Sequence, residues 1–138
     1  MIRFSAPLAA LLLTALAGCG SDQDTNGGGG GDPAPIVVRS PHPGASVSSP
    51  VAITGTASVF EGTVQLRVLD AGGREIGRAF TTARAGAPER GAFSGDVEFT
   101  VERAQDGLVE AFEENAASQG EGAEGNLFTV KVPVRLEP

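Results

Sequence analysis

The sequence predicts an all-β fold: one β-sandwich domain of about seven strands, preceded by a signal peptide and a disordered tether. From residue 36 onward, apolar and polar residues alternate in short segments separated by Gly, Pro, Asp and Asn, which is the period-2 pattern of half-buried strands. The 138 residues of the chain leave room for one domain. We therefore divide the chain into residues 1–18, 19–35 and 36–137.

The N-terminus has the three parts of a secretory signal. Arg3 supplies a positive charge, residues 7–16 form an apolar run, and two small residues follow. The run is too short for a mature membrane-spanning helix. The segment that ends it, Leu16-Ala17-Gly18-Cys19, resembles the lipobox of bacterial lipoproteins, in which a peptidase cuts before a cysteine that carries diacylglycerol. The resemblance implies that Cys19 is lipidated and anchors the protein to a membrane.

Residues 20–35, GSDQDTNGGGGGDPAP, predict a flexible tether. They lack large apolar side chains, so they cannot bury enough surface to offset the entropy lost on ordering. Gly20, rather than an aspartate, follows Cys19, which favours the outer membrane in a host with two membranes. We expect an extracytoplasmic protein that is lipid-anchored to the cell membrane or to the outer membrane.

The first three predicted strands show the alternation clearly. Residues 36–39 form a short opening strand that Pro41 and Pro43 end, because proline fixes φ and lacks an N–H donor. The next two strands place the following residues on their inner faces: Val51, Ile53, Gly55, Ala57 and Val59, then Val64, Leu66 and Val68.

The fourth strand, residues 75–82, follows a turn at Asp70-Ala71-Gly72-Gly73 and is less regular. Ile76 and Phe80 share a face with Arg78 between them, which a bulge or an edge position would explain. In the last strand Pro133 indicates an edge on one side. The sixth strand comprises residues 108–113. The fifth and the seventh strand place the following residues inward: Phe93, Gly95, Val97, Phe99 and Val101, then Phe128, Val130, Val132, Val134 and Leu136.

Seven short strands in about 100 residues predict a sandwich of the immunoglobulin type, with a small barrel as the alternative. Helix is disfavoured, because the one segment rich in helix formers, residues 102–117, is interrupted by Gly107. The core Trp, the cysteine pair and the tyrosine corner of antibody domains are missing. The core therefore has to be filled by phenylalanines at positions 60, 80, 93, 99, 112 and 128.

The strand segments resemble a known family, the bacterial immunoglobulin-like domain that often accompanies the GerMN domain of spore-germination proteins. The likeness covers nearly all of residues 36–136. Each motif is short, but their order along the chain is specific. The segments that carry it are Ser40-Pro41 to Pro43-Gly44, Ser48-Ser49-Pro50-Val51, Ile53-Thr54-Gly55-Thr56-Ala57, Val59-Phe60-Glu61-Gly62-Thr63-Val64 and Leu108-Val109-Glu110-Ala111-Phe112-Glu113-Glu114.

The family resemblance implies an extracytoplasmic sandwich that binds or organises something at the cell envelope, with no catalytic residues. The sequence departs from the family pattern in two ways. It has no GerMN domain, which puts a germination role in doubt, and residues 115–126 (NAASQGEGAEGN) form a looser loop than the family's compact Asp-Gly turn.

The composition excludes several other functions. Lys and Arg number 10 against 17 Asp and Glu, for a net charge of −7, so a nucleic-acid-binding face cannot be built. The single cysteine precludes a disulfide framework or a multi-cysteine metal site. We expect no cofactor and no metal.

Few residues qualify for catalysis or metal binding. His42 lies between two prolines and is expected to be a surface turn residue without a catalytic partner. Glu113 and Glu114 are neighbours in a strand, so they point to opposite faces and cannot both reach one ion. Glu121 and Glu124 could add oxygens for weak calcium binding, but their spacing is wider than that of calcium loops.

Glu61 and Phe60, in the Phe-Glu-Gly motif, are the candidate binding residues. One interpretation is that the Glu61 carboxylate accepts backbone N–H bonds and fixes the turn at Gly62. The other makes it part of a ligand-recognition edge.

We therefore predict a membrane-tethered lipoprotein whose immunoglobulin-like domain is a binding or structural module for an unknown envelope protein or polymer. Two alternatives stay open. One is an envelope enzyme, or a carbohydrate- or peptidoglycan-binding accessory, with a site near Glu61; it would require a concave site that brings Glu61 beside Arg67 or Glu110. The other is a purely positional lipoprotein that acts as a spacer.

Overall fold

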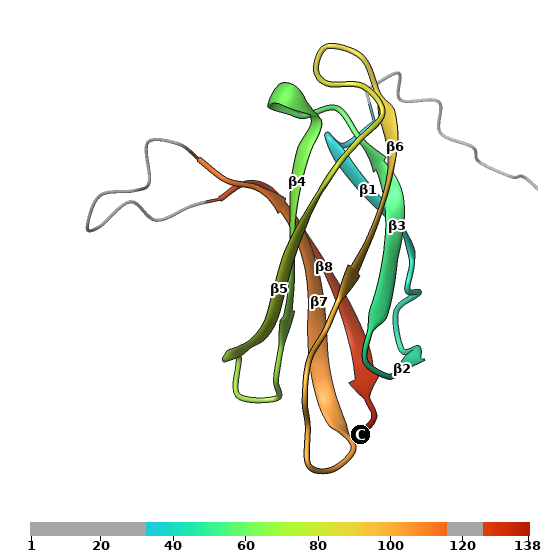
Figure 1. Cartoon of the computed structure of the whole chain (residues 1–138), viewed down its shortest axis with the longest axis vertical. Helices are drawn as coiled ribbons and strands as arrows, with labels where there is room; N and C mark the ends of the chain where they lie inside the picture. The colour runs from blue at the N-terminus through green and yellow to red at the C-terminus, as the bar shows by residue number, and fades with distance from the viewer. Residues whose placement is uncertain (1–32, 116–125) are drawn as a thin grey trace, which may run out of the picture. The chain divides into compact units, whose positions relative to one another are not determined.

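A computed structural model describes residues 33–115 and 126–138, and these residues form strands joined by turns and loops (Figure 1). The only helical element among them is one 3-10 turn, η1 (Phe60–Gly62). The strands are β1 (Ile36–Ser40), β2 (Ser46–Val47), β3 (Val51–Ala57), β4 (Thr63–Leu69), β5 (Glu75–Thr82), β6 (Gly91–Val97), β7 (Gln105–Glu113) and β8 (Leu127–Leu136).

The strands form two sheets that face each other. A three-stranded sheet has the order β1-β3-β6, and a five-stranded sheet has the order β2-β8-β7-β4-β5. All neighbours are antiparallel except β2 and β8, which pair in parallel at Ser46–Arg135 and Val47–Leu136. The predicted immunoglobulin-like sandwich is therefore confirmed. The strand beyond the predicted set is β2, which is too short to show a pattern in the sequence.

The core between the sheets follows the alternation in the sequence. The inward side chains of β3 and β4, such as Ile53 and Leu66, are 0% exposed, while their neighbours in the strands are more accessible. Each fully buried aliphatic side chain of this kind contributes about 1.5–3 kcal/mol by leaving water. Phe93 and Phe99 also lie in this core, as predicted.

Strand β5 lies at the edge of the five-stranded sheet, next to a register shift at Val68, so both predicted causes of its irregular pattern are present. The placement of Phe80 in the core is wrong. Leu66 points inward and is opposite Ala79, so Phe80 points outward and is 70% exposed. Small residues face inward on β5 because the end of β6 and the residue after it approach closely: a Cβ on Gly77 would clash with the carbonyl oxygen of Glu98.

Two further phenylalanines predicted for the core are also exposed. Phe60 lies in η1, outside any strand, and is 73% exposed. Phe128 is 51% exposed, because the pairing of β7 with β8 shifts register between Ala111 and Glu113 and the alternation in β8 holds only from Val130 onward. Phe112 is buried, but on the outer face of the sheet and not in the core.

Several predictions lie outside the described residues, among them the signal peptide, Cys19, the tether up to residue 32, Glu121 and Glu124. Within residues 33–115 and 126–138, no helix is long and apolar enough to cross a membrane.

Candidate functional site

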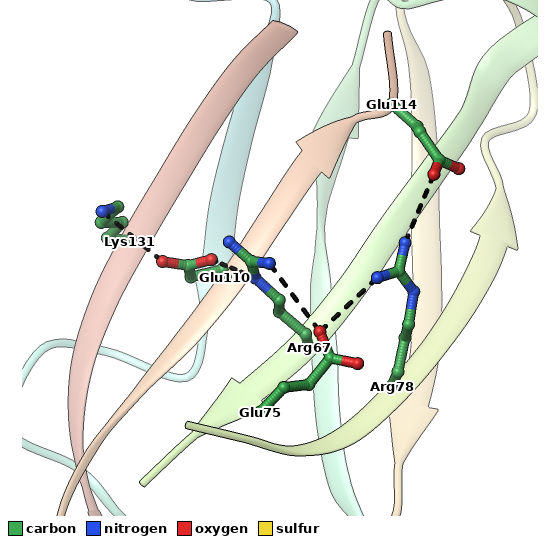
Figure 2. A network of polar contacts seen from close by, with 6 residues as sticks. All are labelled: Arg67, Glu75, Arg78, Glu110, Glu114 and Lys131. Carbon is green, nitrogen blue, oxygen red and sulfur yellow. Dashed lines mark hydrogen bonds and ion pairs between the residues drawn. The ribbon is translucent and has the colours of Figure 1, made fainter. Parts of the chain in front are cut away.

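The outer face of the five-stranded sheet carries a row of four charged residues. Arg78 on β5 is opposite Arg67 on β4, which is opposite Glu110 on β7, which is opposite Lys131 on β8. Paired residues of neighbouring strands point to the same face, so their side chains meet above the sheet. Figure 2 shows these four with Glu75 and Glu114 in one connected network.

Glu110 is the centre of this network. Its side chain is 1% exposed, and its two oxygens contact two cations: Arg67 Nε donates a hydrogen bond to Oε2, and Lys131 Nζ lies 3.6 Å from Oε1. A buried carboxylate is tolerated only when it is paired in this way. Glu110 therefore holds the Arg67 side chain in a fixed position on the sheet.

Two exposed acids hold the second arginine. The Oε2 atom of Glu75 lies 3.8 Å from an Arg67 nitrogen and 3.5 Å from an Arg78 nitrogen, and Glu114 lies 3.7 Å from the other Arg78 nitrogen. Each exposed pair alone contributes about 0–1 kcal/mol, but together they restrict the rotamers of both arginines. Glu113 and Glu114 have separate partners: Glu113 accepts the backbone N–H of Phe60, and Glu114 pairs with Arg78.

The next row of the same face is aromatic. Phe80 and Phe112 flank Gln65 on the three adjacent strands β5, β4 and β7. The guanidinium carbon of Arg67 lies 4.8 Å from the centre of the Phe112 ring and that of Arg78 lies 5.5 Å from it, both within cation–π range. The two arginines cover Phe112, which is 1% exposed, and leave Phe80 open to solvent. We call Gln65, Arg67, Arg78, Phe80 and Phe112 the outer-face surface.

The structure gives the turn-fixing role to Glu113 and not to Glu61. Oε1 of Glu113 accepts the backbone N–H of Phe60 at 2.9 Å, and Gly62 closes the turn by donating its N–H to the carbonyl of Val59 at 3.0 Å. The side chain of Glu61 is exposed and makes no hydrogen bond or ion pair to any described residue. Glu61 is also one of two non-glycine described residues with positive φ, at 52°.

The arrangement that an enzyme near Glu61 would need is not formed by the described residues. Arg67 and Glu110 come together, but as a closed ion pair in the middle of the sheet, whereas Glu61 lies in the turn before β4 begins. His42 is exposed in a turn, as expected. No group of three or more His, Cys, Asp or Glu residues in the described ranges could hold a metal ion.

The hollows in the described surface lie elsewhere. Two are lined by residues toward the far end of the sandwich, including Arg74, one by Pro33, Ser58 and Arg90 beside the start of β1, and one by residues around His42 between β1 and β3. Glu61 and Phe60 line none of these four.

Among the residues that the structure describes, the fold shifts the pKa of Asp70. Its Oδ1 accepts the backbone N–H of Arg74 at 2.9 Å and of Gly72 at 3.0 Å, which closes the β4–β5 turn. These bonds, led by the one from Arg74, lower the pKa of the Asp70 carboxyl from its usual 3.8. The residue serves the predicted turn and has no link to the outer-face surface.

Comparison with protein families identifies the class. The chain matches the immunoglobulin-like domain of bacterial spore germination over residues 35–121, which is more than half its length, and it belongs to that family. The domain is thus of a kind that acts as a binding or structural module, and such all-β domains are not typically enzymes. No curated protein matches the chain.

Sequence reasoning did not identify the outer-face surface. The alternation in β7 places Val109 and Ala111 on the inward face of the strand and Glu110 and Phe112 on the outward face. The sequence therefore did indicate that Glu110 and Phe112 share the outer face. The covering of Phe112 depends on strand neighbours, and the register that brings Arg67 and Arg78 over it joins residues far apart in the chain.

Proposed function

We propose that this protein is a lipid-anchored envelope protein whose immunoglobulin-like domain binds a partner protein through the outer-face surface. The observation that carries the proposal is that Phe80, 70% exposed, lies on the same sheet face as Phe112, which Arg67 and Arg78 cover at cation–π distance. Aromatic and arginine side chains are the types enriched at the energetic centres of protein interfaces.

The charge network supports the same interpretation. Arg67 and Arg78 already have their acidic partners before any partner protein binds, so little side-chain entropy remains to be lost on association. The described strands all belong to the two sheets, and none of them packs on this outer face of the five-stranded sheet. A preorganised sheet face suits a folded protein better than a small molecule, which requires a concave site.

The anchoring part of the proposal rests on the sequence. Its support is the lipobox-like Leu16-Ala17-Gly18-Cys19 after an apolar segment. Membrane fractionation of cells that produce the wild type or Cys19→Ala tests it: the wild type is expected in the membrane fraction with a diacylglycerol-modified Cys19, and the variant in the soluble fraction. Equal distribution of the two would contradict the anchor.

Site-specific crosslinking tests the binding face. A photoreactive residue in place of Phe80 is expected to give one defined protein adduct in intact cells, and Arg78→Glu in the same chain is expected to abolish it. Ala92 is the matched control, because it is exposed on β6 of the other sheet. Adducts of equal yield at Ala92, or none at Phe80, would exclude this face as the binding site.

A further inference from the structure

Three exposed apolar side chains gather at one end of the domain. Phe60 is 73% exposed, Phe128 is 51% exposed and Leu127 is 43% exposed. Together with Phe80, they are the large hydrophobic residues that the described surface exposes. Phe80 belongs to the outer-face surface, whereas the other three lie in η1 and at the first residues of β8. We call Phe60, Leu127 and Phe128 the apolar tip.

The apolar tip lies at the end where the chain enters the domain. The carbonyl of Pro35, just before β1, accepts the N–H of Ser58 at 2.7 Å. Phe60, two residues further on, donates its N–H to Glu113, and Glu113 is opposite Leu127 in the β7–β8 pairing. A continuous set of contacts therefore connects the entry point of the chain to the tip.

The entry point is itself held in place. One terminal nitrogen of Arg90 donates to the carbonyls of Pro33 at 3.1 Å and Ala34 at 2.7 Å, and the other lies 3.3 Å from the hydroxyl of Thr56 on β3. Pro33, the first described residue, is thus fastened to the domain at the same end as η1.

The length of that preceding chain limits the distance to the anchor. From Cys19 to Pro33 there are 14 residue steps, which span at most about 48 Å when fully extended. The opposite end of the sandwich lies about 33 Å further away, the length of the ten-residue strand β8. If the apolar tip contacts the membrane, the tether does not have to run along the domain. If the opposite end contacts the membrane, the tether must run past the whole domain, which uses most of its extended length.

Two residues at this end of the domain have a costly backbone conformation. Glu61 and Phe128 are the described non-glycine residues with positive φ, at 52° and 51°. This left-handed region is costly for a bulky side chain such as phenylalanine, and the exposed ring of Phe128 recovers little of the cost by burial. A residue selected for stability at this position would be Gly or Asn.

We propose that the apolar tip inserts into the headgroup region of the membrane to which Cys19 is anchored, so that the domain stands on the bilayer with its outer-face surface free. The inference rests on the lipid anchor of the proposed function. Two exposed acids flank the tip, Glu61 and Glu114, so the contact is driven by apolar burial and favours zwitterionic over anionic lipid.

A fluorescent probe at the tip tests the proposal with the full lipidated protein. The chain has a single cysteine, Cys19, whose thiol the lipid occupies, so an introduced cysteine is the only free thiol. Phe128→Cys carries an environment-sensitive dye at the tip, and Ala71→Cys carries it in the exposed β4–β5 turn at the opposite end. Both proteins are reconstituted in phosphatidylcholine vesicles after mass spectrometry has verified the diacylglycerol on Cys19.

The expected result is a blue-shifted emission at position 128 that brominated lipid quenches, and an emission at position 71 that only aqueous iodide quenches. Adding Phe60→Ser and Leu127→Ser is expected to reverse the shift, while Phe80→Ser leaves it in place. Identical emission at both positions in protein with verified lipid would overturn the docking inference and leave the lipid anchor intact. An unmodified Cys19 would overturn both. A larger shift in phosphatidylglycerol vesicles would contradict the apolar origin of the contact.

Discussion

Phe93 and Phe112 are both buried, at 4% and 1% exposure, but different parts of the molecule bury them. Phe93 lies between the two sheets, where the opposite sheet covers it. Phe112 lies on the outer face, where Arg67 and Arg78 cover it. Two phenylalanines that are equally buried therefore need not contribute equally to stability. The sheet that covers Phe93 cannot close a cavity left by its truncation, whereas the two arginine side chains that cover Phe112 can move into one.

The core should show the largest effect. Phe93→Ala is expected to lower the free energy of unfolding by about 3–5 kcal/mol, because the packed strands cannot close the cavity. Urea denaturation followed by circular dichroism measures it. Phe80→Ala is the control, with an expected change within about 0.5 kcal/mol, since its ring is largely exposed. A small loss for Phe93→Ala would refute the core assignment.

Truncation of Phe112 on the outer face should lower the free energy of unfolding less than truncation of Phe93 in the core. Phe112→Ala is expected to cost about 2–3 kcal/mol, because the arginine side chains can collapse over the smaller residue. The same urea titration allows direct comparison with Phe93→Ala. If the two losses were equal, the arginine cover would have to be as rigid as the core.

The charge network should rank third. Glu110→Gln keeps the size of the side chain but removes the charge that pairs with Arg67 and Lys131, and we expect a loss of about 1–3 kcal/mol. The value stays below that of a fully buried ion pair because the Lys131 side chain is 63% exposed. Glu114→Gln, which breaks an exposed pair with Arg78, is the control and should cost about 1 kcal/mol or less. Equal effects of the two substitutions would contradict the central role of Glu110.

The β4–β5 turn gives the smallest effect and depends on neither region. Because the folded-state pKa of Asp70 lies below 3.8, its ionised form contributes stability above the unfolded-state pKa of about 3.9. That contribution is lost as the pH falls through the lower folded-state pKa. The stability difference between wild type and Asp70→Asn should therefore be constant above about pH 5 and shrink below about pH 4. Urea titrations at several pH values measure it, and a difference that grows on acidification would contradict the shift.

Sequence reasoning succeeded where a residue's environment follows from its place in one strand. Val64, Leu66 and Val68 alternate with polar residues, and the structure buries all three. The turn at Asp70 was also readable, because its side chain bonds the backbone two and four residues on. Reasoning failed for Phe60, which lies in a turn rather than in a strand.

The phenylalanines that lie in strands show that hydrophobicity does not determine the face to which a side chain points. Hydrophobicity alone assigned six phenylalanines to the core, yet Phe80 and Phe128 point to solvent. Their direction depends on register: Phe80 follows from the pairing of β4 with β5, and Phe128 from the shift between β7 and β8. A one-residue change of register reverses the face of every side chain in a strand, and the sequence of one strand does not determine its register.

By itself the sequence determined the all-β class, seven of the eight described strands and most of the inward aliphatic side chains, because these depend on the period-2 alternation of neighbouring residues. Only the tertiary structure decided which residues meet: Arg67 with Glu110, the arginines with Phe112, and Phe60 with Glu113. The physical reason is that these contacts join segments 34 to 53 residues apart in the chain, where sheet order and register, not local preference, set the distance.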